Sequence, residues 1–390
     1  MLASPKVVDF SSHLSGPMTS HILTELGAAV VKVEQPGVGD GNRRFPPLIH
    51  GLGMFHIAMN SGARSLAVDR RSPHWEKVVT ACAKWADAVI VGLQPDDAKR
   101  HGLGPHSLFE RNPNLVYCSV SGYGDRGPWS GYSGHGLNMD GLAGVVPWDI
   151  ENGQAVVPES YLTVGTTLAA VQAALGIMTA LYRREKGEGG RYVHVSSWGA
   201  AMWWNWRHLD TWASLGRSWP AYKDLGSRYG TYVTSDRRAL LLCPAEKKFW
   251  VAFCDLLGLP ETWRERGRWG GSGMDFGQGY DDERREIARI IETKPLSTWV
   301  ELLEPTRIPF GPLLHWTEAL NSEHARVNNV MRPVRVGDQE VPVARLPIDI
   351  SAVGDTGGAA PGVLSLPEVG QHNREVLDEL GLHELADLIN

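Results

Sequence analysis

The chain has 390 residues, which is long for one ordinary domain and predicts one large domain together with a smaller one. Its hydrophobic content of 43%, charged content of 21% and net charge of -6 lie close to the averages for globular proteins. These values exclude a disordered or collagen-like chain and a protein held on nucleic acid by bulk basicity. We find no run approaching the roughly 20 apolar residues that span a bilayer and no signal-peptide pattern, so we expect a cytoplasmic protein without nucleic-acid or membrane partners.

The first third of the chain alternates short apolar runs with helical segments. Gly16-Pro17 opens the first helix and Gly27 closes it, while Ser72 is placed to cap a second helix at 73–86. Apolar runs separated by helices are typical of a mostly parallel sheet with helices on its faces, so the predicted fold class is α/β. The predicted strands lie at 7–10, 30–33, 64–69, 88–91 and 115–120.

The sequence of the later part of the chain predicts one long helix, a strand and then a lobe of shorter strands and helices. A stretch rich in Ala, Leu, Ile and Met indicates a buried helix at 166–184, and a strand follows at 191–196. Segment 226–325 reads as a smaller α+β lobe, and a surface helix is expected within 369–381. Inside that lobe we expect a strand at 239–243 and helices at 249–257 and 296–303.

Tryptophan is unusually frequent, with 15 residues of this type in the chain. Several of them gather in one short segment, where they either fill an interface or form the aromatic wall of a pocket; we favour packing or an interface. This group consists of Trp198, Trp203, Trp204, Trp206, Trp212 and Trp219.

Common catalytic motifs are missing from the sequence. The glycines of 37–41 follow a strand without leading directly into a helix, so we interpret them as a turn. No phosphate-binding loop, zinc-protease motif or nucleophile elbow is present, and the four cysteines form no C-x-x-C pair, so we expect no metal and no disulfide framework. His135 lies in a glycine-rich loop, 131–138, of the kind that presents functional residues.

Ordered motifs spread over nearly the whole chain resemble the class III CoA-transferase family, the CaiB/BaiF group that also includes α-methylacyl-CoA racemases. The set is specific although each motif alone is weak. The smaller lobe adds similar segments at 230–236 and 309–312. The motifs that carry the resemblance are Val8-Asp-Phe-Ser with Ser15-Gly-Pro17, Leu26-Gly-Ala-Ala-Val-Val-Lys-Val-Glu34, Gly39-Asp40, Asn60 with Arg64-Ser-Leu-Ala-Val-Asp69, Asn112-Pro-Asn-Leu-Val-Tyr-Cys-Ser-Val-Ser-Gly-Tyr-Gly124 with Gly127-Pro128, and Ala174-Leu-Gly-Ile-Met-Thr-Ala-Leu-Tyr182.

The resemblance implies a domain layout and an assembly. A large Rossmann-like domain would be built from both chain ends, 1–198 and 340–390, and a small α+β domain would occupy 226–325. A Trp-rich linker at 199–225 and a return linker at 326–339 would join them. Two subunits would form an interlocked dimer, threaded through each other like linked rings.

The same resemblance implies that the substrates are an acyl-CoA thioester and a carboxylic acid, with coenzyme A as the group transferred. Guanidinium groups at two of the implied CoA-binding positions suit phosphate or adenine. Ala63 and Gly92 depart from the family's Lys and Asn, which predicts weaker or shifted CoA binding. The residues implied to contact CoA are Leu14, Ser15, Gln35, Arg64, Leu93 and Arg100.

The position of the family's nucleophilic aspartate is occupied by Thr166 when the motif is aligned without a gap. Threonine cannot form the mixed anhydride that the family's mechanism requires, and no base adjacent in sequence is evident to activate it. Glu159 and Asp140 are conceivable substitutes because they lie in the same region of sequence. The resemblance implies that His135 stands where racemases carry an acid/base group, and a neutral imidazole suits removal of an acidified α-proton.

Three functions therefore stay open. The chain is predicted to be a CoA-transferase with an unconventional nucleophile. The first alternative is a non-catalytic CoA-binding subunit that pairs with a homologous chain retaining its aspartate. The second alternative is an acyl-CoA racemase or isomerase that uses His135 as its base.

Overall fold

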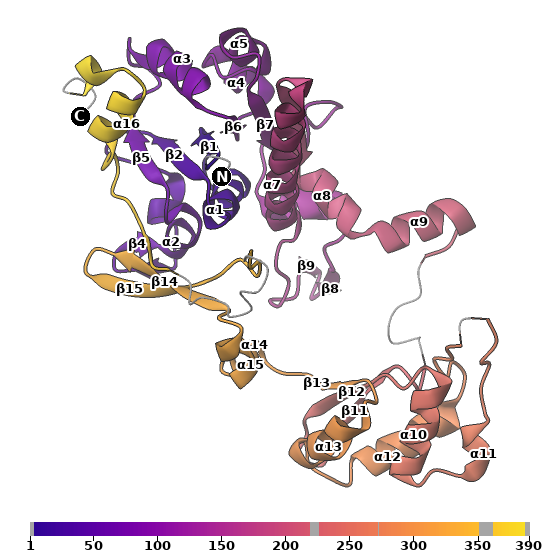
Figure 1. Cartoon of the computed structure of the whole chain (residues 1–390). Helices are drawn as coiled ribbons and strands as arrows, with labels where there is room; N and C mark the ends of the chain where they lie inside the picture. The colour runs from indigo at the N-terminus through magenta and orange to yellow at the C-terminus, as the bar shows by residue number, and fades with distance from the viewer. Residues whose placement is uncertain (1–3, 219–225, 272, 351–361, 387–390) are drawn as a thin grey trace. The chain divides into compact units, whose positions relative to one another are not determined.

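The computed structural model describes residues 4–218, 226–271, 273–350 and 362–386, and the chain divides into two compact units (Figure 1). The large unit comprises Met1–Trp206 and Val327–Asn390, and the small unit comprises Arg207–Arg326. Both ends of the chain therefore contribute to the large unit, which holds the main sheet.

A six-stranded parallel sheet forms the centre of the large unit, in the order β10-β7-β6-β1-β2-β5. The predicted α/β class with a parallel sheet is confirmed. The chain builds β2 and β5 on one side of β1 and then crosses to build β6, β7 and β10 on the other. The connections therefore diverge between β1 and β6, at a topological switch point. The strands are β1 (Lys6–Asp9), β2 (Ala29–Glu34), β5 (Arg64–Ala67), β6 (Ala88–Val91), β7 (Val116–Ser121) and β10 (Arg191–Ser196).

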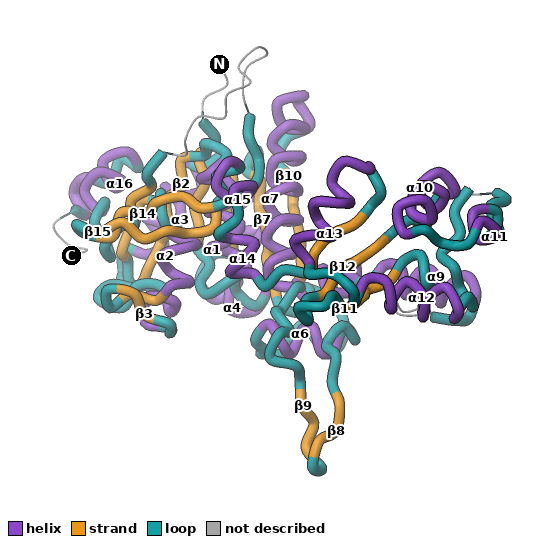
Figure 2. The backbone as a smooth tube through the Cα atoms, turned by 90° about the horizontal axis from the view of Figure 1, so that it is seen from below, coloured by secondary structure: helices purple, strands orange, loops and turns teal. Residues whose placement is uncertain are grey.

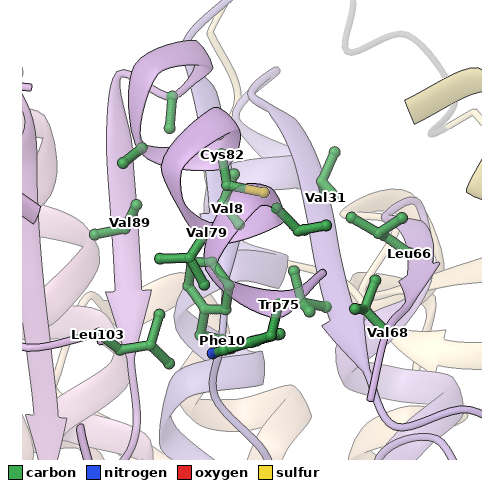
Figure 3. Packing of buried hydrophobic residues seen from close by; sticks show 14 of the residues in the cluster. Val8, Phe10, Val31, Leu66, Val68, Trp75, Val79, Cys82, Val89 and Leu103 are labelled. Carbon is green, nitrogen blue, oxygen red and sulfur yellow. The ribbon is translucent and has the colours of Figure 1, made fainter. Parts of the chain in front are cut away.

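Apolar side chains on both faces of the sheet are buried, as in a parallel sheet covered by helices. Val8 and Val31 face one layer and pack with Trp75 and Cys82 of α3 (Trp75–Trp85) (Figure 3). Helices α5 (Pro105–Arg111) and α16 (Asn373–Glu379) add Leu108, Val376 and Leu377 to that layer. The alternate strand residues, including Val7 and Val30, face α1 (Ser15–Glu25) and α7 (Gly165–Arg183).

Helix α7 is the longest helix and packs against α1, against α8 (Ser197–Trp204) and against strands β7 and β10. Among the described residues, the stretch Gly165–Glu188 is the one helix long and apolar enough, by length and composition, to cross a membrane; the sequence did not lead us to expect one. Half of its apolar window is buried within the fold, and core helices meet the same criteria. Its buried alanines, such as Ala169 and Ala173, explain both the hydropathy and the close packing.

Shorter elements complete the large unit, and its hairpins β3–β4 and β8–β9 were not predicted. In Figure 2 the β8–β9 hairpin extends from the body of the large unit. These elements are β3 (Leu48–Ile49), β4 (Leu52–Gly53), β8 (Asp149–Glu151), β9 (Gln154–Val156), β16 (Leu364–Ser365), α2 (Met54–Asn60), α4 (Pro95–Arg100) and α6 (Gly136–Leu142).

The two predicted linkers contain regular structure. Segment 326–339 includes β14 (Met331–Val336), which pairs antiparallel with β15 (Gln339–Ala344) because alternate residues such as Val334 and Val343 are buried. Segment 199–225 continues helix α8 and forms α9 (Trp206–Leu215). Trp219 lies outside the described residues.

The small unit contains a three-stranded antiparallel sheet covered by helices. Its core includes a buried ion pair between Arg228 and Glu283 at 2.7 Å, and the guanidinium lies 3.9 Å from the Trp250 ring centroid. Its elements are β11 (Gly230–Val233), β12 (Ala239–Leu242), β13 (Phe310–Pro312), α10 (Lys247–Leu257), α11 (Glu261–Arg264), α12 (Asp281–Ile291), α13 (Leu296–Leu303), α14 (Trp316–Leu320) and α15 (Glu323–Val327).

A buried charge network joins the first two strands of the main sheet. Lys32 of β2 is 2% exposed, and its Nζ lies 3.1 Å from a carboxylate oxygen of Asp9 and 3.1 Å from one of Asp40. The same Nζ donates a hydrogen bond of 2.8 Å to the carbonyl of Ser11. Burial alone would lower the pKa of Lys32, but the charges of Asp9, Asp40 and Glu34 outweigh it and raise the pKa, so the amine stays charged.

A second buried pair extends this network towards the C-terminal segment. Arg43 makes a two-pronged contact with Glu34, with nitrogen–oxygen distances of 2.9 and 2.8 Å, and also donates to the carbonyl of Pro367. Burial opposes the charge of Glu34, but hydrogen bonds from Arg43 and Ser65 lower its pKa to about 2. These contacts tie the returning chain to the loop that follows β2.

Replacement of Lys32 tests how much the fold depends on this network. Lys32→Ala leaves two buried carboxylates without their cation, so we expect the free energy of unfolding to fall by about 3–5 kcal/mol. Urea denaturation followed by tryptophan fluorescence measures the change. Lys77→Ala is the control, because Lys77 pairs with Glu384 at the surface and its loss is expected to cost about 1 kcal/mol or less. Equal losses for the two variants would contradict the assigned role of Lys32.

Candidate functional site

A cavity of about 490 Å³ opens at the carboxyl edge of the main sheet. Its walls come from the segments that follow β1, β6 and β7, and from the first residues of α1, α6, α7 and α8. Open α/β sheets bind ligands outside the carboxyl ends of their strands at the switch point, which here lies between β1 and β6. The cavity is therefore the candidate functional site of the large unit.

The loop that follows β1 has an unusual backbone at the cavity wall. His13 adopts a φ of 69°, in the left-handed region that residues other than glycine seldom occupy. Its N–H donates to Asp40 at 3.3 Å, and its carbonyl accepts from the side chain of Asn42. The buried network thus holds this loop in the conformation that lets Leu14 and Ser15 line the cavity.

Thr166 lies in the first turn of α7, lines the cavity and is 6% exposed. Its Oγ1 lies 3.4 Å from Oγ1 of Thr163. Ser15 and Ser197 line the same cavity, with their hydroxyl oxygens 3.2 Å apart. The position predicted for the nucleophile is thus an uncharged hydroxyl wall.

His135 lines the same cavity as Thr166, so the structure brings these two predicted residues to one site. It is exposed and directly precedes α6, and its backbone N–H donates to the side chain of Asn138 at 2.8 Å. The imidazole is therefore accessible to a ligand in the cavity and suits proton transfer there.

The two predicted substitute carboxylates do not line the cavity. Asp140 is buried and accepts hydrogen bonds from the N–H groups of Val164 and Gly165, at 2.8 and 3.0 Å, and from the Tyr161 hydroxyl at 2.8 Å. Burial and the neighbouring carboxylate raise the pKa of Tyr161, so the phenol keeps its proton. Asp140 thus caps the start of α7, whereas Glu159 is exposed in the segment before it.

Some of the residues predicted to contact CoA lie at the cavity and others lie outside it. Leu14, Ser15 and Leu93 line the cavity, and Arg100 pairs with Asp97, which also lines it. Gln35 follows β2, outside the cavity-lining set, and its carbonyl accepts from the N–H of Gly39 at 2.8 Å.

Arg64 stands at the amino end of β5, at the edge of the sheet opposite the cavity. It forms ion pairs with Glu375 and Glu379 of α16, at 2.8 and 2.5 Å. This placement uses its charge to hold the C-terminal helix against the sheet.

Basic side chains near the carboxyl edge were missed in the sequence. Arg70 follows β5, is half-buried and donates to the carbonyl of Phe10 at 3.4 Å. Burial and the positive charges of Arg70 and Arg100 lower the pKa of His101. The signal was the Arg70-Arg71 pair directly after a predicted strand, because such residues fall at the carboxyl edge of a parallel sheet.

No group of three His, Cys, Asp or Glu side chains is placed to hold a metal ion within the part of the chain that the structure describes. Cys82 and Cys118 are buried in the sheet layers, and burial raises the pKa of both thiols. The polar side chains that line the cavity include hydroxyls, the imidazoles of His13 and His135, and the carboxylate of Asp97, which is paired with Arg100.

Comparison with known proteins places the chain in a family. A model of CoA-transferase family III matches residues 2–373. The chain is 26% identical over 380 residues to the acetyl-CoA:oxalate CoA-transferase of Acetobacter aceti, covering 93% of this chain and 92% of that protein. It is 24% identical over 382 residues to human α-methylacyl-CoA racemase, covering 96% and 92% of the two chains. A solved mutant of Rv3272 from Mycobacterium tuberculosis superposes with a TM-score of 0.81 at 23% identity, covering 97% of this chain and 98% of that one.

Asp140→Asn tests whether this carboxylate is structural. The amide keeps one oxygen and presents an NH₂ group to backbone donors, so we expect a loss of about 1–3 kcal/mol of unfolding free energy. Urea denaturation measures the loss, and Glu159→Gln is the exposed control, expected within about 0.5 kcal/mol of the parent. Unchanged stability together with abolished acyl transfer would make Asp140 a reacting group instead.

Proposed function

The chain belongs to CoA-transferase family III, and from that premise we propose that it moves CoA from an acyl-CoA thioester to a carboxylic acid. The observation that supports this most is the coincidence of the family match over nearly the whole chain with a cavity at the switch point of the sheet. The cavity is of the size typical of small-molecule sites. The similarity of the chain to a protein named for acetyl-CoA and oxalate supports an acyl-CoA donor with a short acyl group and a small acceptor acid.

We propose that the thioester end of CoA enters the cavity between Leu14 and Leu93. Both side chains offer apolar surface beside hydroxyl donors, which suits the arm of CoA that carries the sulfur atom. The nucleotide would extend towards Arg70 and Arg100, whose guanidinium groups match phosphate oxygens. Arg64 takes no part in this proposal because its two carboxylate partners satisfy it at the other edge of the sheet.

Thr166 is proposed to stand where relatives carry a nucleophilic aspartate. An acylated threonine is an ordinary ester, which returns its acyl group to CoA too slowly to be a useful intermediate. Asp140 accepts from the backbone at the start of α7, and Asp97, which lines the cavity with Thr166, is paired with Arg100. The reaction therefore needs a carboxylate that comes from a substrate or from a partner chain.

A second candidate is proton exchange at the α-carbon of an acyl-CoA. The exposed imidazole of His135 lines the same cavity as Thr166, and the chain is similar to a racemase. A racemase needs a second acid or base on the opposite face of the carbon, and Thr166 is a poor one. We therefore rank CoA transfer first.

We propose that the chain forms a dimer with a second copy or with a homologous chain, interlocked as the family resemblance implies. Helix α7 presents the exposed side chains of Val171, Leu175 and Tyr182, which are 45%, 67% and 64% exposed. Trp203 and Trp204 of α8 are 61% and 58% exposed. An apolar surface of this kind on an isolated chain is typical of an association surface.

Transfer activity is tested with the purified chain, a set of acyl-CoA donors and free carboxylic acids, with new thioesters measured by mass spectrometry. We expect transfer by the parent chain and a larger rate for Thr166→Asp, which supplies an enzyme carboxylate. If the parent forms no new thioester and Thr166→Asp does, the chain is a subunit that depends on a partner. Copurification of a homologous chain would support that result. Deuterium from solvent entering the α-position without transfer would favour the second candidate.

The dimer is tested by light scattering after size-exclusion chromatography. Leu175→Glu places a charge on the exposed apolar face of α7, so we expect dimer dissociation to rise by about tenfold or more. Lys84→Glu is the matched control because it changes an exposed position on α3, on the other face of the sheet. Equal masses for both variants and the parent would show that the dimer interface does not include this face of α7.

A further inference from the structure

The inner wall of the cavity presents hydroxyl groups with long hydrogen bonds. Thr166 Oγ1 is 3.4 Å from its hydroxyl neighbour, and the hydroxyls of Ser15 and Ser197 are 3.2 Å apart. Normal O–H···O hydrogen bonds measure about 2.5–3.0 Å, so these contacts leave the hydroxyl hydrogens free for a stronger acceptor. Thr166 is more than nine-tenths buried and is one of the residues that line the cavity, so a ligand bound there lies beside this residue.

The charge balance at this wall favours an anion supplied from outside. Asp140 does not line the cavity and accepts from three donors, whereas Asp97 lines it and is paired with Arg100. Ser15, Thr166 and Ser197 lie in the first turns of α1, α7 and α8, where helix dipoles add partial positive charge. Hydroxyl donors in such a field stabilise a carboxylate, which accepts stronger hydrogen bonds than a neutral group does.

We propose that the carboxylate of the acid substrate binds at Thr166 and attacks the acyl-CoA directly, while both substrates occupy the cavity. This inference rests on the proposed CoA-transferase function and specifies how a chain with a threonine at this position performs it. The acid is held where a carboxylate of the protein would otherwise react. Thr166 is then a binding residue for the acceptor acid and forms no covalent bond.

The reaction balances without any group from the protein. A carboxylate oxygen of the acid forms a bond to the thioester carbonyl carbon, and the carbon–sulfur bond breaks to release the CoA thiolate and a mixed anhydride of the two acids. The thiolate then attacks the acyl carbon that came from the acid. The carbon–oxygen bond at that carbon breaks, giving the new thioester and the donor's free carboxylate.

This route carries one oxygen atom from the acceptor acid into the leaving acid within the first turnover. A route through a protein carboxylate gives the first leaving acid an oxygen from the protein instead. The experiment uses the full-length purified protein in excess over acetyl-CoA or succinyl-CoA. Oxalate, succinate or benzoate labelled with oxygen-18 in both carboxylate oxygens is the acceptor, and mass spectrometry follows the leaving acid and the new thioester.

We expect one oxygen-18 atom in the first leaving acid from the parent chain and from Thr166→Ser, which keeps the hydroxyl. Thr166→Val has nearly the same shape without the donor, so the KM for the acid should rise about tenfold with a smaller change in the KM for acyl-CoA. Thr166→Asp is the internal control, because its carboxylate should supply an unlabelled oxygen to the first leaving acid.

The outcomes separate this inference from the proposed function. New thioester with an unlabelled first leaving acid would overturn the direct route while leaving CoA transfer standing. Absence of any new thioester would refute transfer by this chain alone, and calorimetric titration with benzoate would then test the carboxylate site itself. Binding that Thr166→Val weakens about tenfold would support the site, and no benzoate binding, or equal binding by both proteins, would overturn it.

Discussion

The ion pairs of Lys32 with Asp9 and Asp40 are the contacts on which the site geometry depends. A charged amine buried in a sheet is tolerable only with paired carboxylates around it, and here the pairing spans two strands and the loop after β2. The same amine holds the carbonyl of Ser11, and Asp40 holds the N–H of His13. These bonds hold the loop after β1 in a conformation in which His13 has a positive φ, which residues other than glycine seldom adopt.

The buried carboxylates near the cavity have structural partners, and Asp97, which lines the cavity, is paired with Arg100. Asp140 accepts hydrogen bonds from the N–H groups at the start of α7, and these bonds hold the turn that carries Thr166. The hydroxyl wall that results has donors and no nucleophile of its own. The hydroxyl wall can bind and orient a thioester and an acid at the point where the helix termini meet. In the proposed reaction the reactive carboxylate then comes from the acid substrate.

Sequence reasoning predicted the sheet well because its strands are continuous apolar runs, buried on both faces. It missed strand β14, since Arg332 and Pro333 interrupt the apolar pattern and the pairing with β15 is a tertiary contact. Thr166 and His135 were brought to one site as the family resemblance implied. The role of Asp140 was not readable, because its partners lie in a separate segment. Arg64 was assigned to CoA although the parallel direction of β5 puts it at the opposite edge.

A crystal structure of the protein with acetyl-CoA bound tests where the substrate lies in the fold. We expect the thioester carbonyl in the cavity beside Thr166, the sulfur-bearing arm of CoA between Leu14 and Leu93, and the phosphates towards Arg70 and Arg100. Coenzyme A bound at the amino edge of the sheet beside Arg64, with no ligand in the cavity, would contradict this placement.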